Sequence, residues 1–163
     1  MKLIEKDTFG DDINIAHLTD RINYQDLQES QDCLISVQYN ELDFGNTAYG
    51  FNQPFLNNEA NLYFERMKTF SETTINDIID KGIHSWHFYR TGIKGNLKKV
   101  FDKMDSSIPK SDPMIFHFAL DPNCKIEADR KSGSRNPRIY FMVGYKGMIH
   151  PILFDPYHEL NPM

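Results

Sequence analysis

The sequence predicts an α+β fold, in which an antiparallel sheet with a C-terminal β-meander packs against two or three helices. The last third of the chain holds apolar, strand-like stretches separated by turn residues, whereas the middle holds apolar residues at helical spacing. Phe and Tyr supply most of the 13% aromatic content, which favours strands and large packed side chains. We expect residues 1–163 to form a single domain, with residues 1–30 either part of its body or a loosely attached arm.

The N-terminal part predicts one short helix and one β-hairpin. Leu18, Ile22 and Leu27 can line one face of the helix. Residues 33–40 alternate between two faces, which is typical of a half-buried strand. After a Gly-Asn turn, residues 48–55 return as the second strand of the hairpin.

Three helices are predicted in the middle of the chain. Tyr63, Met67 and Phe70 lie at i, i+4 and i+7 and define the first helix. Ser71 is expected to cap a second helix that ends at Gly82. The third helix covers residues 95–104, and four apolar residues form its stripe: Leu97, Val100, Phe101 and Met104.

Strands are predicted at residues 84–90, at residues 114–120 and in a closing hairpin from Arg138 to Asp155. With Lys146-Gly147 as a two-residue turn, the hairpin pairs Arg138 with Asp155, Ile139 with Phe154, Tyr140 with Leu153, Phe141 with Ile152 and Val143 with His150. His150 then lies in an apolar face, as a core histidine would. Pro151 cannot donate to a ladder, so this strand is expected to be an edge or to bulge there.

Charge and composition exclude several classes of function. The net charge of -5 and pI of 5.6 argue against a protein whose whole surface binds nucleic acid, although a local basic patch still can. We find no apolar run long enough for a membrane span and no signal peptide. The two cysteines, Cys33 and Cys124, lack a pairing motif, so we expect reduced thiols and a cytoplasmic protein.

A basic loop before the closing hairpin is the strongest candidate for ligand binding. Guanidinium forks and backbone N–H groups in such a loop can hold phosphates, although a mobile solvated loop is the alternative interpretation. Aromatic side chains nearby can stack on bases. The predicted nucleic-acid-binding residues are Arg130, Lys131, Arg135, Lys98, Lys99 and Tyr157.

Candidate catalytic chemistry centres on His158, which follows the last strand. An exposed histidine on a terminal loop titrates near neutrality, so His158 is the acid–base candidate, and a solvated tail histidine without a catalytic role is the alternative interpretation. Arg135 and Arg138 are the phosphate-binding candidates, and Arg138 forms either a cross-strand ion pair with Asp155 or a clamp that Asp155 holds in place. His84 and His87 point to opposite faces of a strand, so we predict no metal site and no cofactor.

The segment from residue 131 to residue 160 resembles the C-terminal end of RelE-type toxins, which are ribosome-dependent mRNA endonucleases. Ser132-Gly133, Arg135, Arg138 and Tyr157-His158 stand where that family has a Ser-Gly loop, arginines and a terminal Tyr or His. The resemblance covers about thirty residues and implies that the arginines neutralise the scissile phosphate. It also implies that His158 is the general acid or base for attack by the RNA 2′-hydroxyl, without a metal. Such toxins are usually basic and about half as long, whereas this chain is acidic.

Three functions therefore compete at the level of sequence. The first is a nucleic-acid-directed, metal-independent endoribonuclease. The second is a non-catalytic module that binds a protein partner through the edge strand near Pro151 or through an aromatic sheet face. The third is a small-molecule-binding domain, whose pocket would be lined by Trp86, Phe88, Phe116 and Phe118.

Overall fold

The computed structural model describes residues 33–39, 42, 45, 48–56, 58–78, 88–104, 115–121, 135–144 and 147–161. The predicted N-terminal helix and the arm of residues 1–30 lie outside these residues. Five strands and two longer helices carry the architecture and confirm the α+β class. In chain order they are β1 (Ser36–Val37), α3 (Glu59–Ser71), β2 (Tyr89–Thr91), α5 (Gly95–Phe101), β3 (Ile115–Ala119), β4 (Arg138–Val143) and β5 (Met148–Asp155).

The five strands form one mixed sheet in the order β1-β5-β4-β3-β2. Strands β2 to β5 make the predicted antiparallel meander, whereas β1 pairs with β5 in parallel, so a wholly antiparallel sheet was wrong. The predicted N-terminal hairpin was also wrong, since residues 48–56 form turns instead of a second strand. The reason is a competing edge: the N–H of Gln38 donates to the carbonyl of Ile149, and the N–H of Phe154 donates to that of Tyr49.

The β4–β5 hairpin keeps the predicted register only at its open end. Arg138 pairs with Asp155, and the next two pairs also follow the prediction. A bulge between Tyr140 and Phe141 then shifts the ladder, so Phe141 faces Pro151 instead of Ile152. The bulge next to Pro151 confirms the prediction of an edge or a bulge there, and β1 pairs with β5 only at Met148 and Ile149.

Helix α3 follows the predicted apolar stripe, because Tyr63, Met67 and Phe70 are all buried. Ser71 ends this helix and does not cap the next one. The cap is Thr74, whose hydroxyl accepts the N–H of Asp77 at 3.0 Å at the start of the helical residues 75–78. Thr74, three residues after Ser71, is therefore the N-cap that the sequence pattern assigned to Ser71.

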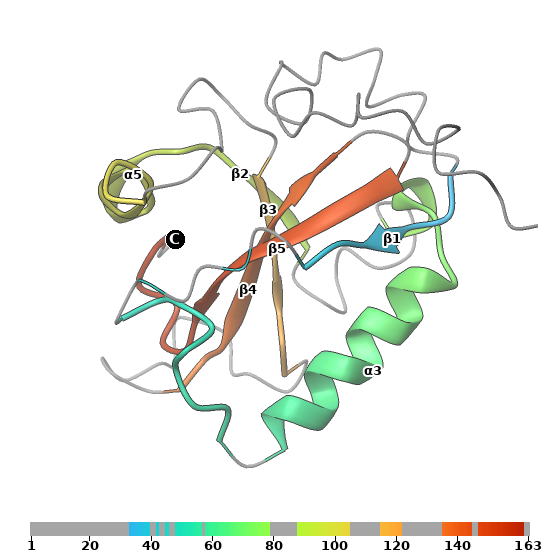
Figure 1. Ribbon diagram of the computed structural model, residues 1–163, viewed down its shortest axis with the longest axis horizontal. Coiled ribbons are helices and arrows are strands. Elements are labelled where there is room, and N and C mark those ends of the chain that lie inside the picture. The colour runs from blue at the N-terminus through green and yellow to red at the C-terminus, as the bar shows by residue number, and fades with distance from the viewer. Residues whose placement is uncertain are drawn as a thin grey trace, which may run out of the picture.

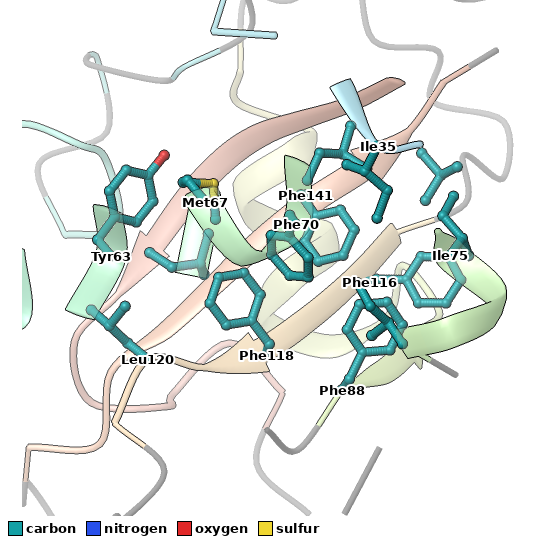
Figure 2. Packing of buried hydrophobic residues seen from close by; sticks show 14 of the residues in the cluster. Ile35, Tyr63, Met67, Phe70, Ile75, Phe88, Phe116, Phe118, Leu120 and Phe141 are labelled. Atoms are coloured by element: carbon teal, nitrogen blue, oxygen red, sulfur yellow. The ribbon is translucent and has the colours of Figure 1, made fainter. Parts of the chain in front are cut away.

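Two apolar clusters cover the two faces of the sheet, and Figure 1 shows α3 and α5 well apart with the sheet between them. On the α3 face, Phe70 packs edge-on against Phe118 and also contacts Phe141 (Figure 2). Phe88 and Phe116 stack within the same cluster, so these rings are core and do not line a ligand pocket. Trp86 lies outside the described residues.

The α5 face is closed by a helix of the predicted amphipathic type. Leu97, Val100 and Phe101 are buried against the sheet, and Met104 packs beside them half-buried. Leu160 of the C-terminal segment joins the same cluster. Among the helices that the structure describes, none is long and apolar enough to cross a bilayer.

Candidate functional site

The α5 face of the sheet combines its apolar cluster with buried polar side chains. Because side chains alternate along a strand, β3 and β4 place His117, Arg138 and Tyr140 on this same face. The polar or ionisable side chains buried here are Thr91, His117, Arg138, Tyr140, His150, Asp155 and His158. Buried polar groups of this density need to be matched to one another, which makes this face the chemically richest part of the described structure.

Arg138 lies inside the protein and does not present its charge to solvent. It pairs with Asp155 in the strand register, as predicted, and its Nη1 donates to the Oδ1 of Asn136 at 2.8 Å. The side chain is buried. The strand register is as predicted, and the buried guanidinium is not exposed as a phosphate clamp would require.

Asp155 organises the turn that follows β5. Its Oδ1 accepts the N–H of Tyr157 at 3.2 Å, and its Oδ2 accepts the N–H of Leu160 at 2.8 Å. Burial raises the pKa of Asp155 above its ordinary value, and these backbone hydrogen bonds oppose that rise. The carboxylate therefore folds the chain back towards the sheet directly after the last strand.

His158 is carried into the interior by this turn, and the prediction of an exposed loop histidine was wrong. It is 2% exposed and adopts a left-handed backbone conformation with φ of 56°. Its ring centroid lies 5.7 Å from that of His117. The sequence shows that a turn begins at Asp155-Pro156, but it does not show on which side of the sheet the turn lies.

His117 is the residue of this cluster that sequence reasoning did not select. Its Nδ1 is hydrogen-bonded to the hydroxyl of Thr91, and its ring stacks on Tyr140 with centroids 5.2 Å apart. Tyr89 lies on its other side, at 6.0 Å between centroids. The alternation of residues 114–120 could have placed His117 opposite the phenylalanines, although the partners come from strands whose pairing the sequence does not reveal.

Arg135 is bound to Glu59 and does not extend into solvent. Its Nε donates to Oε1 of Glu59 at 2.7 Å and its Nη2 to Oε2 at 2.6 Å, while Nη2 also donates to the carbonyl of Pro54 at 2.9 Å. The guanidinium lies over the rings of Tyr157 and Phe154, at 5.5 and 5.8 Å from their centroids. Hydrogen bonding to Glu59 raises the pKa of Arg135. Arg135 and Tyr157 thus contact each other, as two of the residues predicted to bind nucleic acid.

Helix α5 carries the predicted lysines on its outer side. Lys98 and Lys99 are exposed, and Lys98 forms an i,i+4 ion pair with Asp102 at 2.7 Å. Lys99 donates to the side-chain oxygen of Asn96 at 3.3 Å. Arg130 and Lys131 lie outside the described residues. The structure therefore does not bring Arg135, Arg138 and His158 to one exposed spot, and the exposed positive charge lies on a different element.

Within the described part of the chain, no three His, Cys, Asp or Glu side chains gather as a metal site requires. Comparisons with protein-family models, with curated proteins and with solved structures find no match to this chain.

Proposed function

We propose that the chain is an RNA-directed binding protein and that helix α5 with the adjoining strand β2 forms its contact surface. The observation that supports this is the charge of residues 88–104. This stretch holds a single acid, Asp102, and its five cations are all exposed: Arg90, Lys94, Lys98, Lys99 and Lys103. The whole chain has a net charge of -5, so this surface is positive within an acidic protein.

The helix is oriented so that these charges face outwards. Leu97, Val100 and Phe101 fix the buried side of α5. Lys98 and Lys99 lie between them in the sequence and are exposed. Neutralising phosphates with lysines releases counterions, which gives an affinity that falls steeply with salt. The cytoplasmic setting expected from the unpaired cysteine pattern belongs to the same proposal.

Salt-dependent binding of a labelled RNA tests this function. Lys99→Ala and Lys103→Ala should each weaken binding and lower the slope of log affinity against log salt by about 0.7, the value for one phosphate contact on a single strand. Lys68→Ala is the matched control, since Lys68 is an exposed lysine on α3 across the sheet. Equal binding by all four proteins, or no RNA binding by the wild type, would overturn the proposal. Capture of a protein instead of RNA by this surface would favour the interaction module.

Cleavage of the bound RNA is a second candidate, favoured by the contact between His117 and His158. Two imidazoles can divide the chemistry without a metal: one accepts the proton of the 2′-hydroxyl as its oxygen attacks phosphorus, and the other protonates the departing 5′-oxygen. The products are a 2′,3′-cyclic phosphate and a 5′-hydroxyl. Both rings are buried, so this reaction requires the turn at residues 156–161 to move away from the sheet.

RNA cleavage in the presence of a metal chelator tests this second candidate. Wild type should produce cyclic phosphate ends, and His117→Gln and His158→Asn should each abolish them. Asn is chosen at position 158 because it tolerates the left-handed backbone there. Intact RNA after incubation with folded wild type would leave binding as the function.

A further inference from the structure

Tyr89 lies on β2, the last strand of the sheet that the structure describes, and the exposed cations of residues 88–104 lie near it in the sequence. Strand β2 pairs with β3 and is the last strand in the sheet order. Its register places Tyr89 opposite His117, so both side chains lie on the α5 face. Tyr89 is 39% exposed, and Arg90 beside it is exposed as well. Tyr89 thus presents an aromatic ring on the α5 face of the described sheet, whereas Arg90, which pairs with Phe116, points to the opposite face.

Buried rings support Tyr89 from the inside. The Tyr89 ring packs on His117, which in turn stacks on Tyr140 and is hydrogen-bonded to Thr91. His117 and Tyr140 are both buried. A ring that is held by such a stack loses little conformational freedom when a ligand binds, which lowers the entropic cost of association.

We propose that Tyr89 is a base-stacking platform and that the partner of this surface is single-stranded RNA. This inference rests on the proposed function, because the cations of residues 88–104 supply the phosphate contacts. A planar ring on the same sheet face as α5, whose lysines are exposed, matches a nucleotide with its exposed base and charged backbone. Bases in a duplex are already stacked on their neighbours, so their faces are not available to Tyr89. The site should therefore discriminate against double-stranded RNA.

Fluorescence anisotropy with one labelled sequence, offered as single strand and as duplex, measures this discrimination. Wild type should bind the single strand more tightly. Tyr89→Leu should weaken single-strand binding about tenfold, because stacking is lost while the apolar contact with His117 is kept. Tyr89→Phe should bind as wild type does. Phe64→Ala is the control, since Phe64 is an exposed aromatic on α3.

Stacking itself can be observed with 2-aminopurine placed in the single strand, whose fluorescence should be quenched by wild type and by Tyr89→Phe but not by Tyr89→Leu. Single-stranded DNA of the same sequence forms a further arm, and preference for DNA would overturn the assignment to RNA. If Lys99→Ala and Lys103→Ala weaken binding but Tyr89→Leu does not, the stacking platform fails and the RNA-binding function stands. If wild type binds no RNA, the proposed function itself has failed.

Discussion

Arg135 and Glu59 lie 76 residues apart in the chain and form a two-bond ion pair that joins the segment just before β4 to the first turn of α3. Glu59 is 6% exposed, and its Oε2 also accepts the N–H of Leu56 at 2.8 Å. An acidic residue in the first turn also suits the positive end of the helix dipole. The arginine that resembled a phosphate ligand in the sequence thus holds two layers of the fold together.

Breaking this pair should destabilise the protein. Arg135→Ala leaves the buried Glu59 carboxylate without its counter-charge and should lower the free energy of unfolding by about 2 kcal/mol or more. Urea denaturation followed by circular dichroism measures the change. Lys98→Ala is the control, since its pair with Asp102 is 59% and 48% exposed and should contribute below about 1 kcal/mol. Equal losses for the two variants would contradict a structural role for Arg135.

Gly144 should not tolerate a larger residue. A Cβ atom there would lie 2.9 Å from Nε2 of His150, which is buried and cannot easily move away. Gly144→Ala should therefore cost about 1–3 kcal/mol of stability, as overpacking does. Gly92→Ala is the matched control because nothing lies within 4 Å of its Cβ position. The melting temperatures of the two variants are compared by thermal unfolding. An unchanged melting temperature for Gly144→Ala would show that the His150 ring can move away from the added methyl group and would contradict the prediction.

Asp155 should determine the stability of the C-terminal turn. Asp155→Ala removes the acceptors of two backbone N–H groups, whereas Asp155→Asn keeps one acceptor oxygen. We expect losses of about 2–4 kcal/mol for Ala and a smaller loss for Asn. Hydrogen exchange of the Leu160 amide gives a local measurement, and Asp102→Ala on the exposed side of α5 is the control. Unchanged protection of Leu160 in Asp155→Ala would contradict this role.

His150 should make stability depend on pH. Burial lowers the pKa of His150 below its ordinary value of 6.5. Below pH 6.5 the unfolded chain therefore binds a proton that the folded state does not. The free energy of unfolding decreases as the pH is lowered, by up to about 1.4 kcal/mol per pH unit, until the pKa of the folded state is reached. His150→Gln should reduce this dependence in urea titrations between about pH 5 and 7.5. Parallel curves for the two proteins would contradict the assignment to His150.

Local pattern was enough to predict elements whose own residues carry the signal. The apolar stripes at Tyr63, Met67 and Phe70 and at Leu97, Val100 and Phe101 are buried as their spacing predicts. The open end of the last hairpin follows the predicted pairing, because alternation fixes which residues can face the core.

Local pattern failed where a distant partner decided the outcome. The direction of β1 depends on a pairing edge offered by β5, more than a hundred residues later. The bulge next to Pro151 changes the register without any change in hydrophobic alternation. Nothing in the sequence around Arg135 predicts that it pairs with Glu59, because only the packing of α3 against the sheet brings the two residues together.

By itself, the sequence determined the α+β class, the C-terminal meander and the buried sides of both helices, since each depends on periodicity within a short segment. Tertiary structure decided the candidate site. Arg138, Arg135 and His158 were candidate ligand-binding residues in the sequence, but Arg138 and His158 are buried and Arg135 is paired with the distant Glu59. The exposed charge near Tyr89 and the contact between His117 and His158 arise only when the strands pair, because long-range contacts leave no mark in local periodicity.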